Sequence, residues 1–171
     1  MELIRTDDFE AVKAAYIDVI DHTPGIENHA HWVYGRHPSD ESLREYIAGG
    51  EMYALKDGKQ IAGTVVIVMH QGKEYEPVQW GIPLASDKVA TLHLLAVCPA
   101  YRGRALGSLI IEKAKEIARQ NGKKALRLDT LETNLPAQRM YEKAGLSHRG
   151  NQHWYAENTG WMDFRLYEFL L

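Results

Sequence analysis

At residues 94–107 the chain reads Leu94-Leu-Ala-Val-Cys-Pro-Ala-Tyr-Arg-Gly-Arg-Ala-Leu-Gly107, and one hydrophobic pattern gives way to another there. Residues 90–97 are mostly apolar over the length of a buried strand. From Leu106 the apolar residues recur at helical spacing until Asn121-Gly122, which is a typical helix end. A strand that enters a helix through a glycine-containing turn presents free backbone N–H groups and the positive end of the helix dipole. The segment therefore predicts an anion site that suits a pyrophosphate.

Two arginines add local positive charge to this turn, in a chain whose formal net charge is −3. They are Arg102 and Arg104. A Walker A loop is excluded because no lysine follows Gly107, and the run from Gly103 to Gly107 does not fit a dinucleotide-binding glycine pattern. For the turn taken alone, a solvated basic loop closed by glycine remains the alternative.

The flanking sequence predicts strands and helices along nearly the whole chain. Helices are expected after Asp7 or Asp8, after Ser39, from Leu106 and from Asn134. The turn signals Asp57-Gly58 and Asn158-Thr159-Gly160 each join two strands, whereas residues 22–38 are irregular and residues 70–88 form a long connection. Strands are expected at residues 3–5, 52–56, 60–69, 90–97, 125–131, 146–155 and 162–170. The pattern predicts one α/β (α+β) domain over residues 1–171, with a mixed sheet and helices on both faces.

The composition is that of a globular domain, with 45% hydrophobic and 25% charged residues. The net charge argues against a general nucleic-acid or membrane-surface binder. Cys98 is the only cysteine, so an internal disulfide is impossible, which suits a reducing compartment. Residues 1–5 start no signal-like apolar run, and the apolar stretch at residues 61–69 is too short to cross a bilayer. We expect a cytoplasmic protein.

Together with residues 134–146, which read Asn134-Leu-Pro-Ala-Gln-Arg-Met-Tyr-Glu-Lys-Ala-Gly-Leu146, the segment at 94–107 resembles the GNAT superfamily of acyl-CoA-dependent N-acetyltransferases. Two positions depart from the family pattern: Ala105 replaces its central glycine, and Leu146 replaces the commoner phenylalanine. The resemblance implies a mostly antiparallel sheet of six to seven strands, with one strand pair splayed to hold the pantetheine arm. It also implies acetyl-CoA as co-substrate.

The resemblance assigns the cofactor to two parts of the chain. Backbone groups of the strand end hold the pantetheine arm, with the N–H of Leu95 donating to the thioester oxygen, and the turn holds the pyrophosphate. Asn134 would touch the pantetheine arm, and its position also fits a plain helix N-cap. The implied cofactor-binding residues are Leu95, Ala96, Val97, Arg102, Gly103, Arg104, Ala105, Leu106, Gly107, Ser108, Asn134, Ala137 and Tyr141.

Two catalytic residues are expected. Tyr141 would protonate the departing CoA thiolate, with aromatic packing against the sheet as its alternative role. His93 has a suitable intrinsic pKa for a base and matches a histidine of the arylalkylamine N-acetyltransferases. Strand alternation predicts that it shares a face with Leu95 and Val97. Asp129, Glu132 or water are rival bases, and a satisfied core histidine is the alternative for His93.

Other residues bear on the acceptor and on rival chemistry. Aromatic and histidine side chains could wall the acceptor site: Trp32, Tyr34, His31, Trp80 and Tyr155. With the acidic residues Asp21, Glu27, Glu76 and Glu157 they are compatible with a cationic small molecule or a peptide N-terminus. The histidines at 22, 29, 31 and 37 lack the ligand spacing of a metal site, so no metal is expected. A ping-pong route through Cys98 is disfavoured because nothing activates the thiol.

We therefore expect an N-acetyltransferase that moves an acetyl group directly from acetyl-CoA to the primary amine of a small molecule. A protein or peptide acetyltransferase is the first alternative, and a non-catalytic acyl-CoA-binding sensor is the second. No nucleic-acid or membrane partner is expected. A homodimer is possible through the C-terminal strands, which carry Trp161, Phe164 and Phe169.

Overall fold

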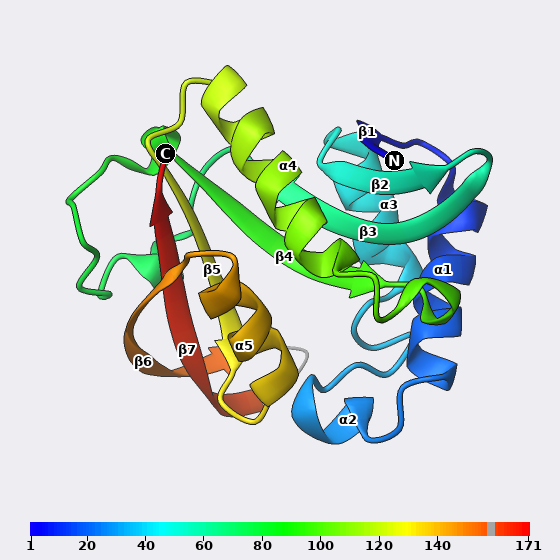
Figure 1. Ribbon diagram of the computed structural model, residues 1–171. Coiled ribbons are helices and arrows are strands. Elements are labelled where there is room, and N and C mark those ends of the chain that lie inside the picture. Colours follow the sequence, from blue (N-terminus) through cyan, green and yellow to red (C-terminus); the bar gives the residue numbers. More distant parts are fainter. Residues whose placement is uncertain (157–159) are drawn as a thin grey trace.

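The computed structural model describes residues 1–156 and 160–171. This described part of the chain forms seven strands and five α-helices (Figure 1). They are β1 (Glu2–Arg5), α1 (Phe9–Asp21), α2 (Ile26–His29), α3 (Asp40–Ala48), β2 (Met52–Asp57), β3 (Gln60–Val68), β4 (Val89–Val97), α4 (Leu106–Gln120), β5 (Ala125–Leu131), α5 (Leu135–Lys143), β6 (Ser147–Ala156) and β7 (Gly160–Leu170). The described chain contains no helix long and apolar enough to cross a membrane.

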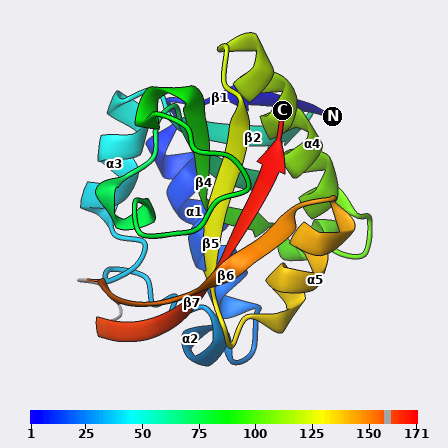
Figure 2. The ribbon, with the colours of Figure 1, turned by 90° about the vertical axis from the view of Figure 1, so that its left-hand side faces the viewer.

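All the strands form one sheet in the order β1-β2-β3-β4-β5-β7-β6. Every neighbouring pair is antiparallel except β4 and β5, which run parallel. Turned by 90°, the ribbon shows α1 and α3 on one face of the sheet and α4 and α5 on the other (Figure 2). The expected mixed, mostly antiparallel sheet with helices on both faces is confirmed.

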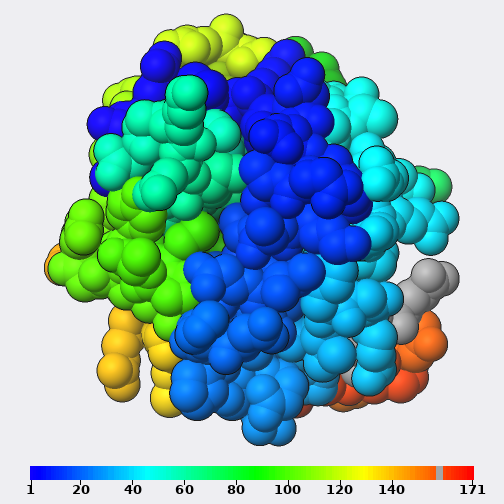
Figure 3. Space-filling model, turned by 90° about the vertical axis from the view of Figure 1, so that its right-hand side faces the viewer, coloured from blue at the N-terminus to red at the C-terminus, as the bar shows by residue number. Residues whose placement is uncertain are grey.

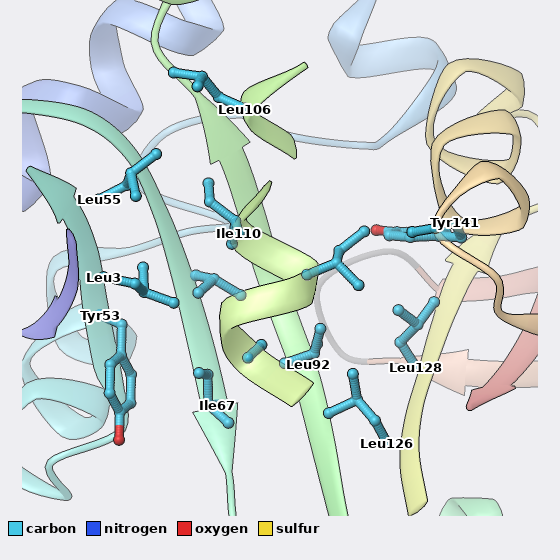
Figure 4. Close-up of a cluster of buried hydrophobic side chains, with 14 of the residues drawn as sticks. Leu3, Tyr53, Leu55, Ile67, Leu92, Leu106, Ile110, Leu126, Leu128 and Tyr141 are labelled. Atoms are coloured by element: carbon cyan, nitrogen blue, oxygen red, sulfur yellow. The ribbon is translucent and has the colours of Figure 1, made fainter. Parts of the chain in front are cut away.

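Each face of the sheet has its own hydrophobic core. On the α4 and α5 face, Ile110 and Ile111 of α4 and Tyr141 of α5 pack with inward residues of the strands (Figure 4). On the opposite face, α1 contributes Phe9, Val12, Tyr16 and Val19 to a second cluster. In the space-filling view α1 fills the middle of the surface between the β2–β3 turn and α3 (Figure 3). These residues recur at the three- and four-residue spacing of one helical face, which is why they could be found from the sequence.

Strand β4 contains a bulge that changes which side chains face each core. Val66 of β3 pairs with His93, whereas Thr64 pairs with Ala96, so β4 carries one extra residue between the two pairs. Leu94 lies at this point with a φ of 50°, a left-handed conformation that is unusual for leucine. The hydroxyl of Tyr16 donates to the Leu94 carbonyl oxygen at 2.7 Å, so α1 holds the bulge from one side.

Beyond the bulge, β4 separates from β5. The two strands pair only from Val89 opposite Ala125 to Leu92 opposite Leu128. After this point the two strands no longer pair with each other, up to the end of β4 at Val97 and the end of β5 at Leu131. The expected splayed strand pair is therefore present (Figure 1).

The connection between β3 and β4 lies against β5 and β7 and is attached by a buried ion pair. Arg127 and Glu168 are 1% and 0% exposed, and their closest side-chain atoms are 2.8 Å apart. Arg127 also donates to the Gln71 side chain and to the Ile82 carbonyl, and Glu168 accepts from the Gly81 N–H. Removing either partner of such a buried pair typically costs about 3–5 kcal/mol. This attachment fixes the connection, residues 70–88, over the sheet face that α1 and α3 also cover.

Most expected element boundaries agree with the structure within two residues. Asp8, Ser39 and Asn134 each cap the helix that follows through a side-chain oxygen. Short elements were missed: α2 falls in the segment expected to be irregular. Residues Asn158 and Thr159 of the expected last turn, and Glu157 beside them, lie outside the described residues.

Candidate active site

A cavity of about 1030 Å³ occupies the splay between β4 and β5. Its walls come from the ends of both strands, from α5, from the segment around α2, and from the β6–β7 hairpin. Side chains from both faces of the sheet reach it, because the strands no longer pair there. A cavity of this size is large enough for a small-molecule site.

The two sides of the cavity differ in chemistry. On the α5 side, the lining residues are mostly apolar or small: Leu95, Val97, Asn134, Ala137, Met140 and Tyr141. On the other side, the lining residues are aromatic or titratable: Trp32, His37, Tyr46, Glu74, His93, Asp129 and Trp154. The cavity therefore joins a mostly apolar side to a polar and aromatic chamber through the opening in the sheet.

The turn before α4 has the geometry of an anion site. Ala105 is the N-cap of α4 and has φ 55° and ψ 24°, a left-handed conformation that suits the glycine usual in the family. The backbone N–H groups of residues 103–108 donate no hydrogen bond within the described chain. These groups point from a helix N-terminus and are available to a phosphate. Gly107 faces Met140 of α5, and a Cβ there would clash with the sulfur of Met140 unless that side chain moved.

The two arginines of the turn have partners inside the protein. Arg102 donates to the His22 carbonyl at 2.8 Å and also to the Thr23 hydroxyl, at the end of α1. Arg104 lies over the ring of Tyr101, 5.3 Å from its centroid. Arg102 still lines the cavity, but its guanidinium fastens the turn to α1, which the sequence did not indicate.

Tyr141 brings a phenol to the cavity from α5 (Figure 4). Its side chain is 8% exposed, and its hydroxyl makes no hydrogen bond to the described residues. Burial, followed by the nearby Asp129, raises the pKa of Tyr141 well above its usual value, so the phenol keeps its proton. Asn134 caps α5 by accepting from the Ala137 N–H at 3.3 Å, so its structural role is present.

The expected orientation of His93 is wrong. Because of the bulge, His93 shares its face with Ala96, and Leu95 and Val97 point to the opposite face. Strand alternation assumes a regular strand, and the one extra residue reverses the assignment. His93 nevertheless lines the cavity, on the aromatic side, and its Nε2 lies 3.3 Å from the Thr91 hydroxyl.

The expected acceptor residues are only partly brought together. Trp32 and Tyr155 line the cavity. His31 and Tyr34 do not, and the Tyr34 hydroxyl instead donates to Asp40 at 2.6 Å, at the start of α3. Trp80 does not line this cavity either. The guanidinium carbon of Arg127 lies 4.2 Å from the centroid of the Trp80 ring, beside a second cavity of about 450 Å³. Aromatic composition alone could not separate these environments.

Sequence reasoning missed several residues of the chamber. Glu74 lines it, whereas Asp21, Glu27 and Glu76 do not. Tyr46 and Trp154 form walls that no local motif indicated. Of the rival bases, Asp129 lines the cavity and Glu132 does not. Asp129 could be found because it lies near the end of β5, the strand expected beside β4.

Other proposed chemistry finds no support at this site. Among residues 1–156 and 160–171, no three His, Cys, Asp or Glu side chains gather as a metal site. Cys98 is buried, and desolvation raises the pKa of its thiol to about 11. A protonated thiol is a poor nucleophile, which disfavours an acyl-cysteine route.

Comparisons with known proteins agree with this geometry. The model of the Acetyltransferase (GNAT) family matches residues 17–146. A candidate ribosomal protein bS18-alanine N-acetyltransferase of Bacillus subtilis is 32% identical over 79 residues, which cover 46% of this chain and 52% of the relative. The thialysine N-epsilon-acetyltransferase of Mus musculus is 35% identical over 69 residues, covering 40% of this chain and 37% of the relative. The matches thus span about half and about a third of those relatives.

The fold has solved counterparts over its whole length. An acetyltransferase structure from Salmonella typhimurium, described with its cofactor acetyl-CoA, has a TM-score of 0.69 and 16% identity, covering 100% of this chain and 94% of that one. At this identity the likeness concerns the fold. The family match covers most of the chain, including both segments that build the splay and the turn before α4. The chain belongs to the GNAT acetyltransferase family.

Proposed function

We propose that this chain is an acetyl-CoA-dependent N-acetyltransferase that acts directly on the primary amine of a small molecule. The observation that carries the proposal is one cavity at the opening between β4 and β5, which the hydroxyl of Tyr141 faces with no partner among the described residues. Arg102, which also lines this cavity, precedes the free N–H groups before α4.

The residues present fit acetyl-CoA. The N–H groups of residues 103–108 suit its pyrophosphate. The end of β4 from Leu95 to Val97 pairs with β3 but not with β5, so its β5 side offers backbone groups to an extended pantetheine arm. Ala105 already has the left-handed conformation that the turn needs, so the departure from glycine does not prevent the turn from forming. When bound, acetyl-CoA supplies an activated acetyl group.

The chemistry then requires one group that protonates and one that accepts a proton. Tyr141 is suited to protonate a leaving thiolate, because its phenol is protonated, faces the cavity and has no competing partner among the described residues. His93 is suited to accept the proton of the attacking ammonium, directly or through water. It stands on the far side of the opening from Tyr141, where an amine would approach.

Acetylation of a peptide N-terminus is the second candidate, favoured by the activity named for the Bacillus relative. A small-molecule acceptor is supported by the chamber itself. It is walled by the β6–β7 hairpin and the α2 segment, so the acceptor reaches the opening through a cavity.

The proposal is tested by measuring thiol release from acetyl-CoA with a panel of amines, amino acids and peptides. We expect release with small amines and a fall in kcat of about 10²-fold or more in Tyr141→Phe. Tyr167→Phe is the matched control, because its ring packs 5.7 Å from that of Tyr141 while its hydroxyl donates to Glu142. Binding of CoA without release by any amine would support the sensor, and preference for a peptide would support the second candidate.

A further inference from the structure

The aromatic chamber carries negative charge that the proposed acetyl transfer does not itself require. Two carboxylates line it, Asp129 from β5 and Glu74 from the connection between β3 and β4. Of the described residues around the cavity, Arg102 is the only lysine or arginine, and its guanidinium is bonded to His22 and Thr23. The free charge in the chamber is therefore acidic.

Asp129 is held in place by a hydrogen bond, whereas Glu74 is an exposed residue of the neighbouring connection. The hydroxyl of Tyr75, a buried residue, donates to Asp129 at 2.6 Å, which leaves the other carboxylate oxygen free of partners within the described chain. Glu74 belongs to the same turn as Tyr75 and lines the same chamber. Its carboxylate folds back over Gly72, where any Cβ would clash with it. The Arg127 attachment described above fixes this connection on the sheet.

The walls around these carboxylates are aromatic. Trp154 stacks on Tyr75 with ring centroids 5.7 Å apart, and Tyr46 and Trp32 line the cavity from the opposite segments. Aromatic faces combined with carboxylates favour a cation, because the ring quadrupole and the negative charge attract it together. Tyr141 is a buried residue whose hydroxyl faces the cavity and has no partner among the described residues, and it marks where the reacting group enters from the other side.

We propose that the acceptor is a diamine, or a larger polyamine, whose second ammonium group binds between Asp129 and Glu74 while its reacting amine lies at the opening between β4 and β5. The inference rests on the proposed acetyl transfer. An acceptor with its own carboxylate beside the second amine is disfavoured, because that group would face the same two negative charges.

Paired substrates isolate the second charge. 1,5-Diaminopentane and pentylamine have the same carbon chain and differ in one amino group. We expect the diamine to have a kcat/KM about tenfold or more above that of the monoamine, mainly through a lower KM. The reason is that a carboxylate and an aromatic wall together stabilise a partly desolvated cation. Lysine and a peptide with a free N-terminal alanine complete the panel.

Two variants assign the effect to the carboxylates. Glu74→Gln and Asp129→Asn are each expected to lower the ratio of diamine to monoamine kcat/KM several-fold. Glu76→Gln is the matched control, because Glu76 follows on the same connection but lines the second cavity, so the ratio should stay at its original value. Calorimetric titration of 1,5-diaminopentane into the protein with CoA should show weaker binding in the same two variants. Glu74 is exposed, so its variant folds even if Asp129→Asn does not.

The outcomes distinguish the cation site, the class of acceptor and the acetyl transfer itself. A ratio near one, or a ratio unchanged in both variants, overturns the cation site. Preference for lysine or the peptide overturns the diamine class and leaves acetyl transfer standing. Absence of thiol release with every amine overturns the proposed function itself.

Discussion

Ala105 carries backbone strain at the position where the family usually has glycine. An L-residue in the left-handed region costs about 1–2 kcal/mol in the folded state, and glycine avoids most of that cost. Glycine also makes the unfolded chain more flexible, which lowers stability by about 0.4–1 kcal/mol. We therefore expect Ala105→Gly to raise the free energy of unfolding by up to about 1 kcal/mol, as measured by denaturant titration. Ala100→Gly is the control, because Ala100 is exposed and does not have a positive φ. Equal losses in both variants would contradict the strain.

The roles of single residues were predictable from the sequence where a local motif determines the backbone conformation. The N-caps Asp8, Ser39 and Asn134 follow from side-chain chemistry that acts over three residues. His93 shows the limit, because its facing depends on an extra residue in β4 that no local pattern announces. Whether an aromatic residue lines the cavity was equally unpredictable, as Tyr34 and Trp32 show.

Among the elements, β4 shapes the candidate site most directly, because its bulge and its separation from β5 create the opening in the sheet. The sequence predicted the strand but not the bulge, which depends on contacts with α1. We expect Tyr16→Phe to lower the free energy of unfolding by about 1–3 kcal/mol, because the buried Leu94 carbonyl loses its donor. It should also weaken CoA binding, measured by calorimetry, by loosening the end of β4.

A second tyrosine provides the comparison for that prediction. The hydroxyl of Tyr53 accepts from the side chain of Arg5 near the far edge of the sheet, so Tyr53→Phe should leave CoA affinity unchanged. If Tyr16→Phe has the same free energy of unfolding and the same CoA affinity as the original chain, the bulge does not depend on α1.

At the scale of the molecule, the order of elements and both cores followed from hydrophobic periodicity, as the amphipathic faces of α1 and α4 show. The chamber did not, because its walls come from α2, the connection before β4 and the β6–β7 hairpin, which meet only after folding. The two carboxylates illustrate this: Glu74 and Asp129 are 55 positions apart in the sequence, and a turn and a strand end bring them to one cavity.

His37, a partly buried residue of the chamber wall, makes the stability of the whole molecule sensitive to acid. Its ring packs on Trp32 with centroids 6.5 Å apart, and desolvation, followed by the nearby His93, lowers its pKa from 6.5 to about 4. As pH falls through this window the unfolded chain binds the proton first, so stability present above about pH 6.5 is lost towards pH 4, by about 3 kcal/mol. His37→Phe keeps a ring against Trp32 and cannot titrate, so denaturant titrations from pH 7 to 4.5 should give a flatter profile than the original chain. His70→Phe, at an exposed site, should keep the original slope. Parallel profiles for His37→Phe and the original chain would show that His37 is not the group responsible.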